Sequence, residues 1–225
     1  MKIIKPSVEI YFHLPQQVDE SGCMSGLPFH PEAFLEQAGR LCYKSEDKIT
    51  EDSASKFVTM LNKNRHHAML EHCVASAKYV CDRGMTHELV RHRLASFAQE
   101  STRYCNYSKD KFDNAVGVIM PPFTTTDGRA ETEWREAMMD AERHYLNMLE
   151  FGEPPQIARS VLPISLKTEI WITCNLREWM HVFNMRCAKT AHPQIRALML
   201  ETLKVFRVVV PAMFEPLAKT YIEEN

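Results

Sequence analysis

Apolar residues recur along the chain at two spacings, and the longer spacing predicts helices. Its clearest example covers residues 131–151, where steps of three or four residues connect Trp134, Met138, Ala141, Tyr145 and Met148. These steps place all five side chains on one face of an α-helix. The same spacing predicts five further helices, over residues 31–41, 53–61, 86–93, 176–188 and 194–208. Thr86 is expected to cap the third of these, and a short helix is expected near Arg159.

Alternation at every second residue predicts strands. It is clearest over residues 70–81, where one side of the expected strand carries Cys73, Ala75, Ala77 and Tyr79. Shorter strands are expected over residues 8–12, 116–120 and 166–174. The strands and helices interleave without a regular βαβ rhythm, and no linker separates two domains. The pattern therefore predicts a single α+β domain over residues 1–225.

Composition excludes several classes of protein. The chain has 225 residues and a formal net charge of −2, which argues against a nucleic-acid-binding protein. No stretch approaches the roughly 18 apolar residues of a membrane span, and the first residues do not resemble a signal peptide. The seven cysteines contain no CxxC pair, which favours reduced thiols. A cytoplasmic protein with no membrane partner is expected.

The candidate chemistry is concentrated in the run RHRLASFAQESTRY, residues 91–104. Its three arginines carry planar forks of donors that match phosphate oxygens. A solvated basic face is the alternative interpretation. None of the seven glycines forms a GxGxxG motif or a phosphate-binding loop. If a dinucleotide binds, side chains must therefore neutralise its phosphates, and the candidates are Arg91, Arg93 and Arg177.

This run also carries a family resemblance. RHR followed after seven positions by Ser101 resembles the signature of the flavin-dependent thymidylate synthases. Four further segments are similar in order and spacing: HHAMLEH at 66–72, IAR at 157–159, NLR at 175–177 and NMR at 184–186. The resemblance implies a mostly antiparallel sheet flanked by helices, and a homotetramer with shared active sites. It also implies reductive methylation of dUMP to dTMP, with methylenetetrahydrofolate as one-carbon donor, FADH2 as hydride donor and NADPH re-reducing the flavin.

The resemblance also assigns site residues. FAD contacts are implied for His66, Arg91, His92, Arg93, Gln99, Asn175, Arg177 and His181. Contacts to dUMP are implied for Glu88, Arg91, Gln99, Glu100, Ser101, Thr102, Arg103, Arg159 and Arg186. Arg186 is the implied catalytic residue, because a guanidinium against the uracil ring stabilises negative charge as C5 becomes a nucleophile. Two positions depart from many relatives: Ala68 replaces a hydroxyl residue and His181 replaces an asparagine.

Several alternatives stay open at this stage. Ser101 has no recognisable Ser-His-Asp arrangement, so it is interpreted as a hydrogen-bond partner of the substrate rather than as a nucleophile. Glu88 and Arg91, three residues apart on the expected helix, could form a simple ion pair. No metal is expected. A metallohydrolase using His66, His67 and His72 is nevertheless one rival interpretation, and a non-catalytic nucleotide-binding module is another.

Overall fold

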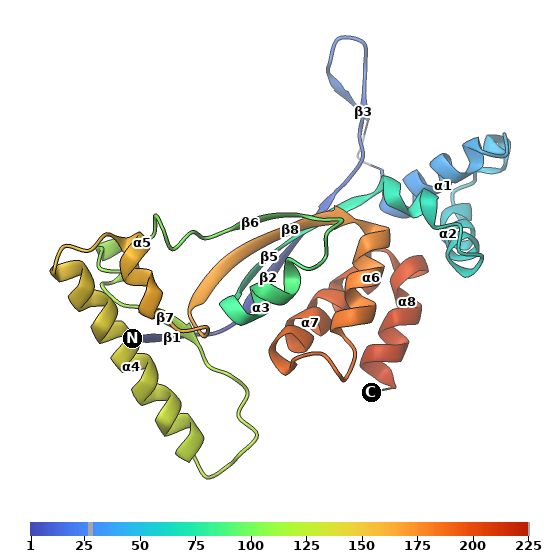
Figure 1. Cartoon of the computed structure of the whole chain (residues 1–225). Coiled ribbons are helices and arrows are strands. Elements are labelled where there is room, and N and C mark those ends of the chain that lie inside the picture. Colours follow the sequence, from blue (N-terminus) through green and yellow to red (C-terminus); the bar gives the residue numbers. More distant parts are fainter. Residues whose placement is uncertain (27–28, 225) are drawn as a thin grey trace. The chain divides into compact units, whose positions relative to one another are not determined.

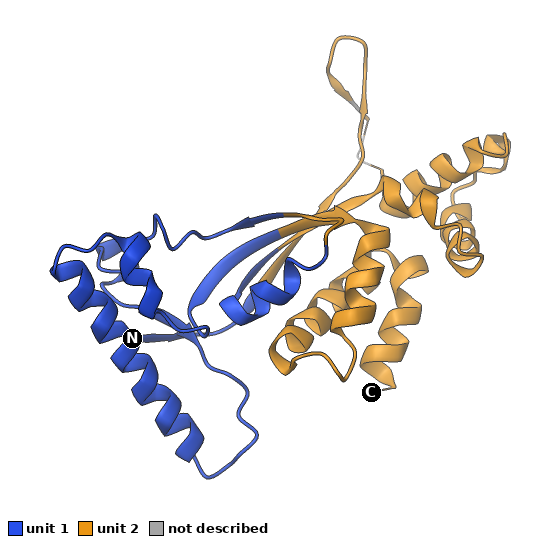
Figure 2. Cartoon of the chain, viewed as in Figure 1, with its two compact units in different colours: residues 1–7, 78–92, 97–171 blue, residues 8–77, 93–96, 172–225 orange. Residues whose placement is uncertain are grey.

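The computed structural model describes residues 1–26 and 29–224. Two compact units divide the chain (Figure 2). Unit 1 comprises Met1–Ser7, Lys78–His92 and Phe97–Trp171, and unit 2 comprises Val8–Ala77, Arg93–Ser96 and Ile172–Asn225. None of the helices in the described residues combines the length and hydropathy that a membrane span needs.

A four-stranded antiparallel sheet has the strand order β2-β5-β8-β6, and Figure 1 shows its strands. Its strands are β2 (Ser7–His13), β5 (Val74–Asp82), β6 (Ser96–Gln99) and β8 (Lys167–Asn175). In β2 the exposed and half-buried residues alternate, as the sequence pattern predicts for a strand with one face toward the core. β5 and β8 each contribute residues to both units. The α+β class is confirmed.

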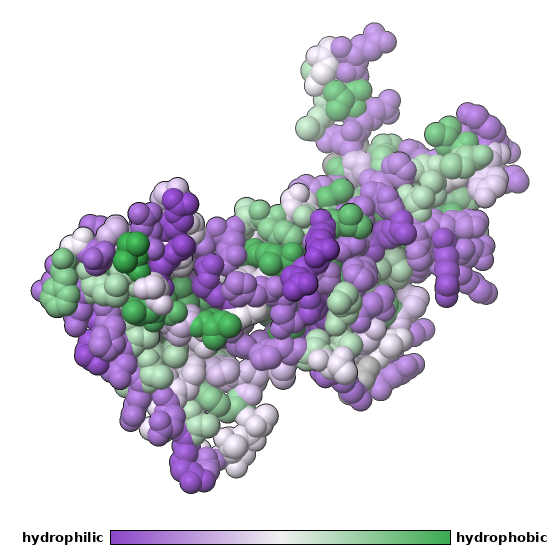
Figure 3. Space-filling model, in the orientation of Figure 1, coloured by the Kyte–Doolittle hydropathy of each residue, from purple (hydrophilic) through white to green (hydrophobic). Residues whose placement is uncertain are grey.

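Two small sheets accompany the main one. In unit 1, β1 (Lys2–Ile4) pairs in parallel with β7 (Gly117–Ile119). In unit 2, β3 (Gln17–Val18) and β4 (Met24–Ser25) form an antiparallel hairpin. Figure 3 shows hydrophobic residues on the surface of this hairpin, where Val18 is 54% and Met24 74% exposed. β1, β3 and β4 were not predicted, whereas β7, which is equally short, lies within the alternating residues 116–120.

Unit 1 is built around the longest helix. The helices of this unit are α3 (Arg83–Leu89), α4 (Arg129–Glu150) and α5 (Pro155–Ala158), with short 3₁₀ segments at Asp110–Phe112 and Arg159–Val161. The predicted apolar face of α4 is confirmed, since Tyr145 is fully buried and Met138 is 9% exposed. They belong to a core cluster with Tyr107, Val116, Val118, Ala158 and Leu166.

Unit 2 is mostly helical. Its helices are α1 (Pro31–Leu41), α2 (Ser53–Lys63), α6 (Leu176–Arg186), α7 (Pro193–Val209) and α8 (Pro211–Ala218), with 3₁₀ segments at Glu46–Lys48 and His67–His72 and a π turn at Lys219–Glu223. Phe206 lies among the rings of Phe12, Trp179, Phe183 and Phe214, with centroids 4.8 to 5.2 Å away. These side chains form the aromatic core of the unit. α8 was not predicted, and its Pro211 occupies the first turn, where a proline is tolerated.

The expected helix over residues 86–93 was wrong at both ends. The helix begins at Arg83 because the Asp82 carboxylate accepts the Met85 N–H at 2.7 Å, so Asp82 is the N-cap. Thr86 is inside the helix, and its hydroxyl donates to the Arg83 carbonyl at 2.9 Å. The helix ends at Leu89, so Arg91 and the two residues after it follow the helix rather than lie on it.

The strand expected over residues 70–81 was also too long. Residues 67–72 instead form the 3₁₀ segment η2 (His67–His72), in which Leu70 is fully buried. Arg65, just before this segment, has φ of 59°, in the left-handed region that non-glycine residues seldom adopt. Alternating strand geometry begins only at Val74.

Candidate functional site

Gln99 holds the start of the segment 99–103 in place within unit 1. Its side-chain amide donates to the Thr86 hydroxyl at 3.0 Å and to the Thr168 hydroxyl at 3.3 Å. Thr86 belongs to α3 and Thr168 to β8. One side chain at the end of β6 therefore bridges a helix and a neighbouring strand.

Glu100 is tied into an ion network. Its carboxylate accepts from Lys167 Nζ at 3.1 Å and from the Tyr107 hydroxyl at 3.0 Å, and its backbone N–H donates to the Glu169 carbonyl at 2.9 Å. Although burial lowers it, hydrogen bonds to Glu169 and Glu100 raise the pKa of Lys167 above its ordinary value. Burial and the Glu100 charge raise the pKa of Tyr107, so its hydroxyl stays a donor at neutral pH. The Glu100 side chain therefore fixes the segment.

The turn at Ser101 is held by hydrogen bonds from its own backbone. The Ser101 carbonyl accepts the N–H groups of Tyr104 and Cys105, at 3.1 and 2.9 Å, and its hydroxyl accepts the Arg103 N–H at 3.4 Å. Among the described residues no histidine or carboxylate hydrogen-bonds the Ser101 hydroxyl. Ser101 therefore lacks the base that a serine nucleophile needs.

Thr102 and Arg159 meet beside this turn. Thr102 is 5% exposed, and its hydroxyl accepts from Arg159 Nη1 at 3.1 Å. Thr102 follows β6, whereas Arg159 begins the 3₁₀ segment after α5. Two of the predicted nucleotide contacts, far apart in the sequence, thus lie side by side in unit 1.

Three arginines of the predicted site have exposed side chains that no carboxylate neutralises. Within the described part of the chain, Arg91, Arg93 and Arg103 form no ion pair, so the Glu88–Arg91 pair does not form. Arg103 lies over the Tyr104 ring at 5.5 Å. Unpaired guanidinium groups can donate hydrogen bonds to the negatively charged phosphate oxygens of a nucleotide or dinucleotide. These residues therefore fit FAD and dUMP. His92, between two of them in sequence, is 3% exposed.

In unit 2, four predicted site residues belong to α6 or to its N-cap. Asn175 caps the helix, since its side chain accepts the Glu178 N–H at 2.9 Å. Arg177 is exposed and forms an ion pair with Glu71. His181 is exposed, and Arg186, half-buried, is the last residue of the helix.

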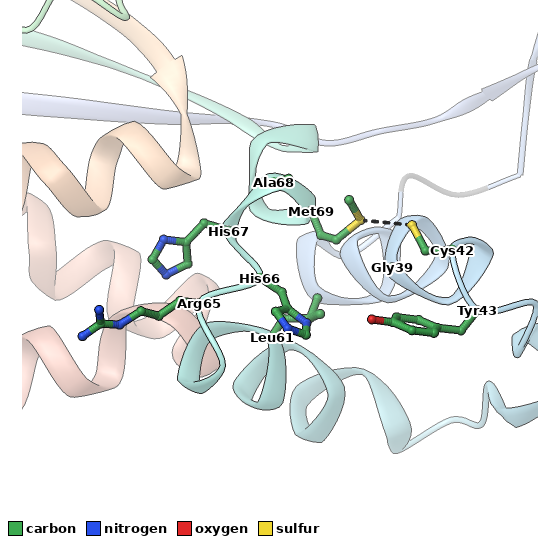
Figure 4. Close-up of a pocket in the computed structure, with 9 residues that line it drawn as sticks. All are labelled: Gly39, Cys42, Tyr43, Leu61, Arg65, His66, His67, Ala68 and Met69. Carbon is green, nitrogen blue, oxygen red and sulfur yellow. Dashed lines mark hydrogen bonds between the residues drawn. The ribbon is translucent and has the colours of Figure 1, made fainter.

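His66 lines a cavity of about 280 Å³ in unit 2 (Figure 4). Its lining also includes Gly39, Cys42, Tyr43, Leu61, Arg65, His67, Ala68 and Met69. Cys42 Sγ lies 3.8 Å from Met69 Sδ. Burial, and then the charges of Arg177 and Arg65, lower the pKa of His67, so its imidazole is neutral at pH 7. Sequence reasoning missed Tyr43 as a lining residue, because nothing in its neighbourhood signals that α1 packs near His66.

The histidines of the rival metal site do not converge. The rings of His66 and His67 point in different directions (Figure 4). Among the residues that the structure describes, His66, His67 and His72 do not form a group whose ligand atoms lie close enough to share an ion. The geometry therefore does not favour the metallohydrolase interpretation.

All seven cysteines are free thiols, and most are inert in this environment. Cys73, Cys81, Cys174 and Cys187 are buried, whereas Cys23 and Cys42 are exposed. Burial raises the pKa of Cys73 to about 11 and those of Cys81 and Cys187 to about 12. A thiol with such a pKa stays protonated at neutral pH and is a poor nucleophile.

Comparison with known proteins shows the family of the chain. Residues 28–212 match the family model described as thymidylate synthase complementing protein. The chain belongs to the family of flavin-dependent thymidylate synthases. It is 34% identical over 193 residues to the flavin-dependent thymidylate synthase of Geobacter sulfurreducens, covering 82% of this chain and 81% of that protein. The enzyme of the same name from Corynebacterium glutamicum is 32% identical over 234 residues, covering 94% of this chain and 89% of that protein.

A relative with lower sequence identity has the same name. The flavin-dependent thymidylate synthase of Pyrococcus furiosus is 29% identical over 173 residues, covering 76% of this chain and 70% of that protein. The resemblance inferred from RHR and the four further segments is therefore confirmed at the level of the family.

Proposed function

We propose that this protein converts dUMP to dTMP, with FAD as its flavin, methylenetetrahydrofolate as one-carbon donor and NADPH as the reductant of the flavin. Membership of the flavin-dependent thymidylate synthases supports the reaction. The observation that carries the ligand assignment is the set of exposed arginines without carboxylate partners in the described chain: Arg91, Arg93 and Arg103. Together with the missing glycine-rich loop, they support phosphate binding by side chains.

On the nucleotide side, the roles divide between binding and catalysis. The Gln99–Arg103 segment and Arg159 bind the phosphate and sugar, helped by Glu88 and Arg91. Glu100 acts by holding the segment, because Lys167 and Tyr107 already occupy its carboxylate. Arg186 lies against the uracil edge and stabilises the negative charge that develops as C5 attacks the one-carbon unit.

On the flavin side, arginine, histidine and amide side chains orient the cofactor. His66, Arg91, His92, Arg93, Gln99, Asn175, Arg177 and His181 are the proposed contacts. The flavin, when bound, supplies the hydride that completes the methyl group. To bind a phosphate, Arg177 must give up part of its ion pair with Glu71. Both side chains are exposed, so they can move apart.

The assembly and location follow the same proposal. The protein acts as one catalytic domain over its full length, and four copies form a homotetramer whose active sites draw residues from more than one subunit. Such an enzyme works in the cytoplasm, where its NADPH and folate are found. The free cysteines are compatible with that compartment.

The source of the methyl hydrogens tests the proposed reaction. We expect purified protein to show the yellow absorbance of bound flavin, which NADPH should bleach without oxygen. When bound FAD is reduced with a deuterated reductant in deuterated buffer, mass spectrometry of dTMP should show one deuterium in the methyl group, with tetrahydrofolate as coproduct. An unlabelled methyl group with dihydrofolate would refute the flavin as hydride donor. Flavin that is reoxidised without dTMP formation would instead support a non-catalytic binding module.

The cysteines provide a second test. Because burial raises their thiol pKa values, Cys73, Cys81 and Cys187 should resist iodoacetamide at pH 8, whereas exposed Cys23 and Cys42 should be alkylated. Each single Cys→Ala variant of the seven should keep most of its turnover of dUMP. The measurements are peptide mass spectrometry and initial rates. A single substitution that abolishes turnover without unfolding the protein would point to a cysteine nucleophile.

A further inference from the structure

A network of four charged side chains runs across three neighbouring strands of unit 1. Lys78 belongs to β5, and both Lys167 and Glu169 belong to β8. Glu100 directly follows β6. In the sheet these strands lie in the order β5-β8-β6. The network therefore connects the central strands of the sheet to the segment 99–103, which contains proposed contacts to the nucleotide.

The carboxylate oxygens of this network all have partners. The two oxygens of Glu169 accept from Lys167 Nζ and from Lys78 Nζ, each at 2.7 Å. The two oxygens of Glu100 accept from Lys167 Nζ at 3.1 Å and from the Tyr107 hydroxyl at 3.0 Å. Hydrogen bonds from Lys167 and then from Lys78 hold the pKa of Glu169 below its ordinary value. Two positive and two negative side chains balance, so the network needs no ligand to neutralise it.

Lys167 is the member that joins the two carboxylates. Its ammonium group donates to both Glu100 and Glu169, and its side chain is 21% exposed, compared with 13% for Glu100. Ion pairs that are partly buried in this way are screened less than pairs on the surface. Without Lys167, two carboxylates that now share one cation would repel each other. That repulsion would push Glu100 out of its present place.

Three consecutive residues of β8 hold the start of the segment. The Glu169 carbonyl accepts the Glu100 N–H at 2.9 Å. The Thr168 hydroxyl accepts from the Gln99 amide at 3.3 Å, and Lys167 binds the Glu100 carboxylate. The contacts of Thr168 and Glu169 fix where the segment begins. The contact of Lys167 fixes how Glu100 is turned, and hence the direction in which the chain leaves β6.

We propose that Lys167 is a positioning residue for the nucleotide: through Glu100 it holds the segment 99–103 in the conformation that binds dUMP. The inference rests on the proposed function, which makes this segment part of the dUMP site. It gives a role to a residue outside the RHR run and the four similar segments. It also explains how Glu100 contributes to binding, although both of its carboxylate oxygens have partners inside the protein.

Steady-state kinetics of the flavin-loaded protein test this role. Lys167→Met should raise the KM for dUMP about tenfold, a usual size for the coupling between residues of one network. The kcat should stay within about twofold of the wild type, because the change affects how well the segment binds and not the chemical step. A lysine that served stability alone would change the melting temperature and the amount of active enzyme, but not the KM for dUMP.

Three further variants show whether Lys167 acts through Glu100. Lys167→Arg should restore much of the affinity, because arginine keeps a cation that can donate to both carboxylates. Glu100→Gln should raise the KM for dUMP to a similar degree, because a neutral amide does not attract Lys167. The variant with both Lys167→Met and Glu100→Gln should show an effect well below the sum of the two single effects.

A matched control removes a lysine of the same unit from a different ion pair. Lys2 pairs with Asp113 on the surface, and its side chain is 47% exposed. Lys2→Met should leave the KM for dUMP unchanged, because neither residue contacts the segment 99–103. The melting temperature of every variant, measured without nucleotide, reports its folding.

The outcomes distinguish this inference from the proposed function. Wild-type protein that does not bind dUMP would overturn the proposed function itself. If the wild type binds dUMP and Lys167→Met has the same KM, only the role of Lys167 is refuted. Additive effects in the double variant would mean that Lys167 acts independently of Glu100, which also refutes the inference. If Lys167→Met does not fold, Glu100→Gln decides, and an unchanged KM for dUMP would then refute the inference.

Discussion

Arg186→Ala should lose about a hundred- to a thousandfold in the rate of dTMP formation, the usual cost of removing one preorganised donor from a transition state. Flavin content should stay close to that of the wild type, because the proposed role of Arg186 concerns the uracil ring rather than the cofactor. The measurements are single-turnover rates of dTMP formation and the absorbance of bound flavin. Near-normal rates would remove Arg186 from its catalytic role.

Two comparison variants sharpen this test. Arg186→Lys should also be slow, because a lysine keeps the charge but loses the planar fork. Lys204→Ala changes an exposed residue of the same unit that pairs with Glu201 at 2.7 Å, and it should not affect the rate. If Arg186 serves only in a salt bridge between subunits, its alanine variant should change the oligomeric state, which light scattering would detect.

Phe206→Ala should destabilise the protein by about 3–5 kcal/mol, the usual cost of removing a buried phenyl ring. Phe206 is fully buried, and four aromatic rings of unit 2 surround it: Phe12, Trp179, Phe183 and Phe214. The cavity left behind cannot close easily, because those rings hold one another apart. Urea unfolding followed by tryptophan fluorescence measures the loss.

The matched control lies on the same helix. Val208 is 79% exposed, so Val208→Ala should change the free energy of unfolding by no more than about 0.5 kcal/mol. The loss in free energy of unfolding for Phe206→Leu should lie between the losses for Phe206→Ala and Val208→Ala, because leucine fills part of the space that the phenyl ring leaves. Equal effects of Phe206→Ala and Val208→Ala would mean that the aromatic cluster does not form in solution.

The sequence by itself determined the elements whose pattern is long and local. The helix predicted over residues 131–151 is α4 (Arg129–Glu150), and the helix predicted over 31–41 has the bounds of α1. The family could also be inferred from the sequence, because the segments that resemble it are contiguous runs of residues. Such runs can be compared without knowing the fold. Both kinds of signal depend only on neighbours along the chain.

Where a helix begins was harder to predict, because two nearby residues can each cap it. The sequence analysis placed the helix cap at Thr86, although Asp82, four residues earlier, is an equally good capping residue. In the structure, Asp82 is the last residue of β5, where its carboxylate meets the Met85 N–H, so the helix starts earlier and Arg91 lies beyond its end. The strand β6, with four residues, was too short to be recognised.

Only the tertiary structure decided which side chains have partners. The amide of Gln99 joins Thr86 to Thr168, and Lys167 occupies the carboxylate of Glu100, although these pairs are distant in sequence. It also left Arg83 Nη1 buried and unpaired. The physical reason is that a hydrogen bond or ion pair needs its two groups within about 3 Å, and folding alone brings such residues together.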